Sequence, residues 1–272
     1  MLYNPTRKKY REISKNVLSF YPVICYNIIC GSFLQNLREP QEEYTMEKTL
    51  KNLHRLIVVC GHFGAGKTNF AVNLAKKLAN EGSPVTLVDM DIVNPYFRAA
   101  DNVSELTALG VRCIVPDFAN TNVDIPSLPP TILGALETAG REPERYTIID
   151  LGGDNGAVAL GMYKRFFNEG AYDMLCAVNM YRPLTEEHAD AEAVLREIEW
   201  SARLTVTGLV NTSNLGAETT AEDITDSIPW AEELAGTLAL PLVCTVAESR
   251  FAEALGGRQD MFFIENATKK LY

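Results

Sequence analysis

The sequence is poor in the side chains that build metal sites and disulfide frameworks. It has three histidines and six cysteines in 272 residues, and no two cysteines have C-x-x-C spacing. The last four, Cys60, Cys113, Cys176 and Cys244, each lie in an apolar, strand-like stretch, where a thiol behaves as a small buried hydrophobe. Structural zinc, a paired-thiol redox centre and a disulfide framework are therefore not expected, which fits a protein of the reducing cytoplasm.

Positive charge is also scarce. The chain has 25 Lys and Arg against 35 Asp and Glu, a formal net charge of -10. Because nucleic-acid binding rests on clustered Lys and Arg, this balance argues against a nucleic-acid partner. The nucleophile-elbow motif of hydrolases is missing, and no internal repeat is evident. The apolar content of 47% is nevertheless enough for a full globular core.

A long hydrophobic run occurs at residues 17–34, after a basic stretch at residues 6–15. This pattern is similar to a signal peptide or a membrane anchor. The run is interrupted by Pro22, Asn27 and Ser32, and no small-residue cleavage site follows it. Membrane insertion is therefore not expected. The alternative is that residues 17–34 form a real membrane anchor. We expect residues 1–50 to be a loosely ordered extension, with translation beginning naturally at Met46, and residues 51–272 to form the folded domain.

The apolar residues 56–60 lead into Gly61-His-Phe-Gly-Ala-Gly-Lys-Thr68, and a helix-forming stretch follows at once. This is the G-x-x-x-x-G-K-[ST] pattern of a phosphate-binding loop between a strand and a helix. Glycine allows backbone N–H groups to converge on a polyphosphate without side chains in the way. We expect Lys67 to contact the outer phosphates and the Thr68 hydroxyl to hold magnesium. The expected nucleotide-binding residues of this loop are Gly61, Gly64, Ala65, Gly66, Lys67, Thr68 and Asn69.

Strand-like and helix-like stretches alternate along the rest of the chain. Strands are expected at 85–91, 111–115, 146–151, 174–178, 204–210 and 242–246, and helices at 131–139, 157–167, 186–200 and 221–238. Apolar strands separated by helices indicate a mainly parallel sheet covered on both faces. The expected fold is α/β: a three-layer α/β/α sandwich of the P-loop NTPase type, whose ligands lie at the carboxyl ends of the strands.

Three polar clusters lie at those ends. Asp89 and Asp91 fall on one side of a strand tip, where one would support magnesium and the other would orient an attacking water. Asp150 follows a later strand and is expected to support magnesium, with Gly153 near a terminal phosphate. The Asn211 amide could pair with the donor and acceptor edges of a purine. Capping or turn formation is the alternative role for Asp89, Asp91 and Asn211.

The order and spacing of these clusters resemble the ParA/MinD-like branch of P-loop NTPases, over about residues 54–250. The resemblance implies that ATP and Mg²⁺ are the cofactors and that the loop residues 64–68 bind the triphosphate. It also implies that Asp89 and Asp91 belong to a first switch, that Asp150 supports magnesium and that Asn211 reads adenine.

One position departs from that resemblance. Many ParA/MinD-like members carry a second lysine near the start of the loop, which reaches the partner's nucleotide in a homodimer, and His62 stands there in this chain. A neutral imidazole cannot supply the same constant charge, so the sequence leaves a homodimer open. Arg98, in the switch-like segment, is the candidate for a transition-state cation in cis or in trans.

These features favour an ATP-binding protein whose slow hydrolysis switches its affinity for a protein partner not yet identified. Lys67, Asp89, Asp91 and Arg98 are the expected catalytic residues, and Thr68, Asp89 and Asp150 the expected magnesium ligands. A small-molecule kinase or ligase, and a nucleotide-binding module without hydrolysis, remain alternatives. The Tyr181-Arg182-Pro183 segment either frames the nucleotide or simply turns the chain, and the sequence leaves both open.

Overall fold

The computed structural model describes residues 52–90, 102–115, 130–139, 141–168 and 171–267. All of them belong to one unit of the chain, residues 44–272. The expected extension at 1–50 and its boundary lie outside the described residues, as do Asp91 and Arg98.

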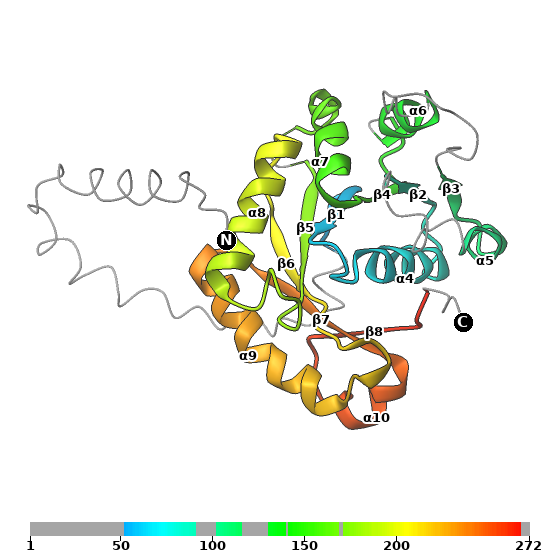
Figure 1. Ribbon diagram of the computed structural model, residues 1–272. Coiled ribbons are helices and arrows are strands. Elements are labelled where there is room, and N and C mark those ends of the chain that lie inside the picture. Colours follow the sequence, from blue (N-terminus) through cyan, green and yellow to red (C-terminus); the bar gives the residue numbers. More distant parts are fainter. Residues whose placement is uncertain (1–51, 91–101, 116–129, 140, 169–170, 268–272) are drawn as a thin grey trace, which may run out of the picture. The chain divides into compact units, whose positions relative to one another are not determined.

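A single parallel sheet forms the centre of this unit (Figure 1). Its strand order is β3-β2-β4-β1-β5-β6-β7-β8, and each neighbouring pair runs parallel. The strands are β1 (Leu56–Gly61), β2 (Val85–Asp89), β3 (Arg112–Ile114), β4 (Tyr146–Asp150), β5 (Asp173–Val178), β6 (Gly208–Asn211), β7 (Leu242–Glu248) and β8 (Met261–Ile264). Because all strands point the same way, their carboxyl ends meet along one edge, where ligands of such sheets bind.

Helices cover both faces of the sheet. Side chains of β1 alternate between them: Ile57 and Val59 join a core cluster with α4, while Val58 and Cys60 join another with α6, α7 and α8. This three-layer α/β/α sandwich confirms the expected fold class. The helices are α4 (Lys67–Asn80), α5 (Val103–Ala108), α6 (Pro130–Ala139), α7 (Gly153–Gly161), α8 (His188–Ala202), α9 (Ala221–Leu238) and α10 (Ala252–Leu255).

The elements differ from the sequence expectation in several places. The strand expected at 204–210 begins only at Gly208, because the Thr205 and Val206 amides donate to the Tyr172 hydroxyl and the Glu199 carboxylate instead. Helix α7 starts at Gly153, four residues before the expected 157, and ends at Gly161, six before the expected 167. Helix α5, the last strand, β8, and the short α10 before it were not expected at all.

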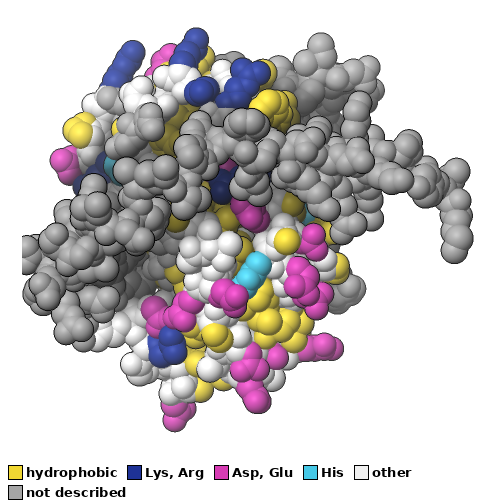
Figure 2. Space-filling model, turned by 90° about the vertical axis from the view of Figure 1, so that its left-hand side faces the viewer, with side chains coloured by type: hydrophobic (Ala, Val, Ile, Leu, Met, Phe, Trp, Pro, Cys, Tyr) yellow, Lys and Arg dark blue, Asp and Glu magenta, His cyan; other side chains and the backbone are white. Residues whose placement is uncertain are grey.

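Charge is unevenly distributed on the face that Figure 2 shows. Lys and Arg side chains gather at its upper edge, whereas Asp and Glu dominate its lower half, at the height where α9 lies in Figure 1. Such an acidic surface would repel a nucleic-acid backbone. Among the described residues, no helix is both long and apolar enough to cross a membrane.

Candidate functional site

The segment between β1 and α4 is shaped by three glycines with positive φ, Gly61 at 140°, Gly64 at 73° and Gly66 at 94°. A side chain is strained at such angles. At Gly61 packing forbids one as well, since an added Cβ would lie 2.4 Å from the Ala177 carbonyl oxygen on the neighbouring strand. The sequence pattern therefore matches a backbone that only glycine can form.

This loop folds around one of its own carbonyl groups, that of His62. The Ala65 amide and the Lys67 ammonium both donate to the His62 carbonyl, at 3.1 and 2.9 Å. Lys67 is 8% exposed, so the ammonium is held close to the loop. The amides in the first turn of α4 have no acceptor within the helix, and the helix dipole adds positive potential there. The loop is thus an anion site of the P-loop type.

Two buried carboxylates stand beside it on neighbouring strands. Asp89 ends β2 and Asp150 ends β4, and the two residues are directly opposite each other in the parallel register. They are 0% and 1% exposed. Together with the Thr68 hydroxyl, they offer the hard oxygen ligands that Mg²⁺ prefers.

A protein-only metal cage is not found in the part of the chain that the structure describes, where no group of three or more His, Cys, Asp and Glu side chains could hold an ion. Mg²⁺ commonly takes one or two protein ligands and completes its shell with water and substrate phosphates. The donor set therefore fits an ion that arrives with a polyphosphate.

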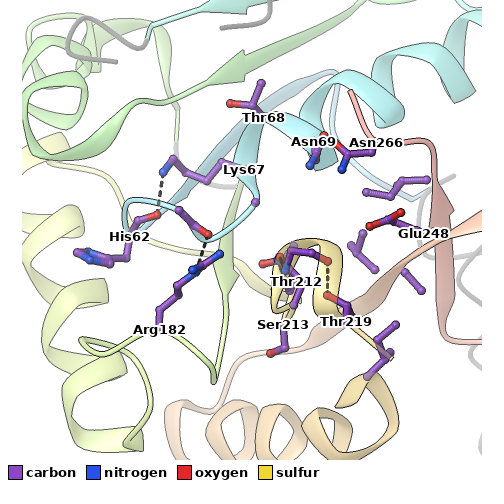
Figure 3. A pocket seen from close by; sticks show the side chains of 18 of the residues that line it. His62, Lys67, Thr68, Asn69, Arg182, Thr212, Ser213, Thr219, Glu248 and Asn266 are labelled. Atoms are coloured by element: carbon purple, nitrogen blue, oxygen red, sulfur yellow. Dashed lines mark hydrogen bonds between the residues drawn. The ribbon is translucent and has the colours of Figure 1, made fainter. Parts of the chain in front are cut away.

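A cavity of about 610 Å³ opens beside the loop (Figure 3). Its lining combines Lys67 with apolar side chains that include Ile224, Val246 and Phe251. Beyond the phosphate loop, the lining residues come from the ends of β7 and β8, from the start of α9 and from the segments after β5, β6, β7 and β8; among them are Arg182, Thr212, Asn214, Glu248, Ile264 and Asn266. A lining that combines charged and apolar side chains suits a phosphorylated ligand with a largely apolar group.

Asn211 does not line this cavity. It ends β6 with its side chain 0% exposed, and its amide donates to the Ser227 hydroxyl at 2.9 Å while its oxygen accepts from the Ser213 amide at 3.1 Å. Its reading of a base stays a prediction. Asn214, three residues on, does line the cavity, although its side chain also bonds to the Thr212 carbonyl and the Gly216 amide.

The other expected residues lie around the same edge. Gly61 to Asn69 form the loop and the start of α4, and Gly153 begins α7 directly beyond β4. The sequence did not single out Glu248 or Asn266, since a lone polar residue after an apolar strand is a weak signal. Arg182 was noted without a decided role.

The segment after β8 is fastened to α4 by two asparagines. Asn73 donates to the Glu265 carbonyl and accepts from the Glu265 amide, at 2.8 and 3.0 Å. Asn69 accepts from the Ala267 amide at 2.8 Å. These bonds hold Asn266, which lines the cavity, in place. The side chains of Asn69 and Asn73 on α4 therefore help to shape this side of the site.

We expect Asn73→Ala to lower the free energy of unfolding by about 2 kcal/mol, because the Asn73 side chain is buried and its removal breaks both hydrogen bonds to the Glu265 backbone. Urea unfolding measures this. Asn80→Ala, at the exposed end of α4, is the matched control and should change stability by less than about 0.5 kcal/mol. Equal effects of the two changes would contradict the role given to Asn73.

The cysteines of the described chain are free, and three of the four are buried. Cys60 and Cys176 face each other on β1 and β5, just below the loop. The hydrogen bond between them and their burial raise the pKa of the Cys60 thiol well above its usual range. A thiol with a raised pKa is a poor nucleophile near neutral pH.

No family model matches the chain. Solved structures with a similar fold include the cell division protein FtsY of Thermotoga maritima, at 21% identity over 72% of this chain and 67% of that one, with a TM-score of 0.45. Another is a nucleotide-binding protein of Archaeoglobus fulgidus in complex with ADP, at 16% identity over 77% and 88% of the chains, with a TM-score of 0.43. A third is the signal recognition particle 54 kDa protein of Aeropyrum pernix in complex with GDP, at 14% identity over 74% and 46%, with a TM-score of 0.47. The P-loop NTPase fold of this chain follows from its own loop geometry and parallel sheet.

Proposed function

We propose that this chain binds Mg-ATP at residues 61–69 and acts as a slow ATPase that switches a protein partner, in the manner of ParA/MinD-like P-loop proteins. The observation that carries the proposal is the phosphate loop, with Lys67 folded against it, at one end of a cavity of about 610 Å³. This volume lies within the range typical of small-molecule sites.

Each part of the site has a role in this proposal. The amides from Gly64 to Thr68 and the Lys67 ammonium hold the phosphates, and Thr68, Asp89 and Asp150 hold magnesium. When bound, the ion would supply positive charge that offsets the negative charge of the phosphates. Asp91 and Arg98, with Asp89, are proposed to form the switch that senses the terminal phosphate and to orient and stabilise the attack of water.

Two exposed apolar side chains support a protein partner. Phe63 in the phosphate loop is 61% exposed, and Leu184 in the loop after β5 is 56% exposed. The two loops are joined, because the Arg182 side chain donates to the Gly64 carbonyl at 3.1 Å. A partner that covers both side chains would sense the nucleotide directly. The free thiols of the described chain suit a cytoplasmic protein, which we include in the proposal.

The decisive experiment is a titration of the purified chain with fluorescently labelled ATP and GTP, each with and without Mg²⁺. We expect saturable, magnesium-strengthened binding of ATP and weaker binding of GTP. Preference for GTP would contradict the assignment of the base, and failure to bind either nucleotide would contradict the whole proposal. Hydrolysis that rises with a co-purified protein supports the switch, whereas phosphate transferred to a metabolite would favour a kinase.

A further inference from the structure

The loop that follows β5, residues 179–185, is held in one conformation by hydrogen bonds. Asn179 is 0% exposed, and its side-chain oxygen accepts from the Tyr181 and Asn214 amides at 2.9 and 3.3 Å. Its carbonyl accepts from the Thr185 hydroxyl at 2.6 Å. The Tyr181 hydroxyl donates to the Asp223 carbonyl at 2.7 Å, which ties the loop to α9. A side chain carried by this loop is therefore presented in a fixed place.

Arg182 is that side chain. Its Nε donates to the Gly64 carbonyl at 3.1 Å, so the planar guanidinium lies against the phosphate loop (Figure 3). It lines the same cavity as Lys67 and His62. A guanidinium has further N–H donors on its two terminal nitrogens and keeps its charge at any physiological pH.

We propose that Arg182 is a second phosphate-binding cation of the site, which depends on the nucleotide binding proposed above. A bound triphosphate concentrates negative charge at the loop, and Lys67 alone neutralises a small part of it. Arg182 adds a permanent charge to the lining of the cavity. Its bond to Gly64 also offsets the partial negative charge of a loop carbonyl. Arg182, in the loop after β5, would thus supply a positive charge that His62 does not.

The test compares the dissociation constant for labelled ATP among Arg182 variants. Arg182→Gln and Arg182→Met remove the charge, and we expect each to weaken ATP binding about tenfold. Arg182→Lys keeps the charge and can still reach a carbonyl or a phosphate, so it should stay within about threefold of wild type. Arg196→Gln, on the exposed face of α8, is the matched control and should bind as wild type does.

The outcomes separate the two proposals. If wild type binds ATP and the neutral variants bind it within about twofold of wild type, the role of Arg182 is refuted while nucleotide binding stands. If the Lys variant is as weak as the Gln and Met variants, charge is not what matters and the inference also fails. Absence of binding by folded wild type refutes nucleotide binding itself. Thermal melting of each variant without nucleotide checks that the fold is kept.

Discussion

Replacing Lys67 with alanine is expected to abolish measurable ATP binding, with a loss of at least about 100-fold in affinity. The ammonium is nearly buried and held at 2.9 Å from the His62 carbonyl, which places it beside the amides that would surround the phosphates. Its removal takes away a charge-assisted contact that solvent cannot replace, because the ammonium is shielded within the loop. The fold should persist, since this bond lies within the loop itself.

The measurement is the same titration with labelled ATP, and Lys77→Ala is the matched control. Lys77 belongs to the same helix, but it pairs with Glu81 near the other end and should leave binding unchanged. Wild-type affinity in a folded Lys67→Ala protein would mean that the loop does not hold the phosphates. A loss shared by Lys77→Ala would instead indicate a general effect on α4.

The phosphate half of the site could be predicted because its information is local. The strand, the glycines and the helix from residue 56 to residue 80 are continuous in sequence, and each carries a strong conformational preference. The same holds for α9, whose expected limits of 221 and 238 match the structure. Its start is marked by a capping box between Thr220 and Asp223, which hydrogen-bonds in both directions.

The other half of the cavity could not be predicted, because it forms only when distant segments meet. Arg182 is hydrogen-bonded to Gly64, which lies 118 positions away in the sequence, and Glu265 is hydrogen-bonded to Asn73, which lies 192 positions away. No local pattern encodes such pairs. Strand β8 was not expected from the sequence because it is only four residues long, although its Met-Phe-Phe-Ile sequence is rich in strand-forming side chains.

Asn211 shows why the role of a polar residue at a strand end is hard to decide from sequence. Its position after an apolar stretch favours both a ligand contact and a structural one. In the folded chain its amide joins β6 to α9 through Ser227 and shapes the turn that follows through Ser213. The segment it supports, residues 212–216, does reach the cavity. An effect of Asn211 on base binding would therefore be transmitted through this segment.

Gly61→Ala is expected to be the most destabilising single change in the phosphate loop, with a loss of about 3 kcal/mol or more in the free energy of unfolding. Gly61 pairs with Ala177 in the register of β1 and β5, the two strands at the centre of the site. An added methyl would meet the Ala177 carbonyl oxygen at 2.4 Å, and φ of 140° is costly for alanine. The clash can be relieved only if the two strands separate where the loop begins. We therefore expect Gly61→Ala to lose nucleotide binding as well as stability.

Gly82→Ala separates the two causes of that loss. Gly82 also has a positive φ, of 87°, but an added Cβ there would meet nothing within 4 Å. It should therefore cost only the conformational strain, about 1 kcal/mol. Urea unfolding of both variants, followed by circular dichroism, gives the difference that is due to the close approach of β1 and β5. If the two glycine variants were equally stable, β1 and β5 would have to move apart at Gly61 without cost. The phosphate loop would then not be supported by a rigid contact between these strands.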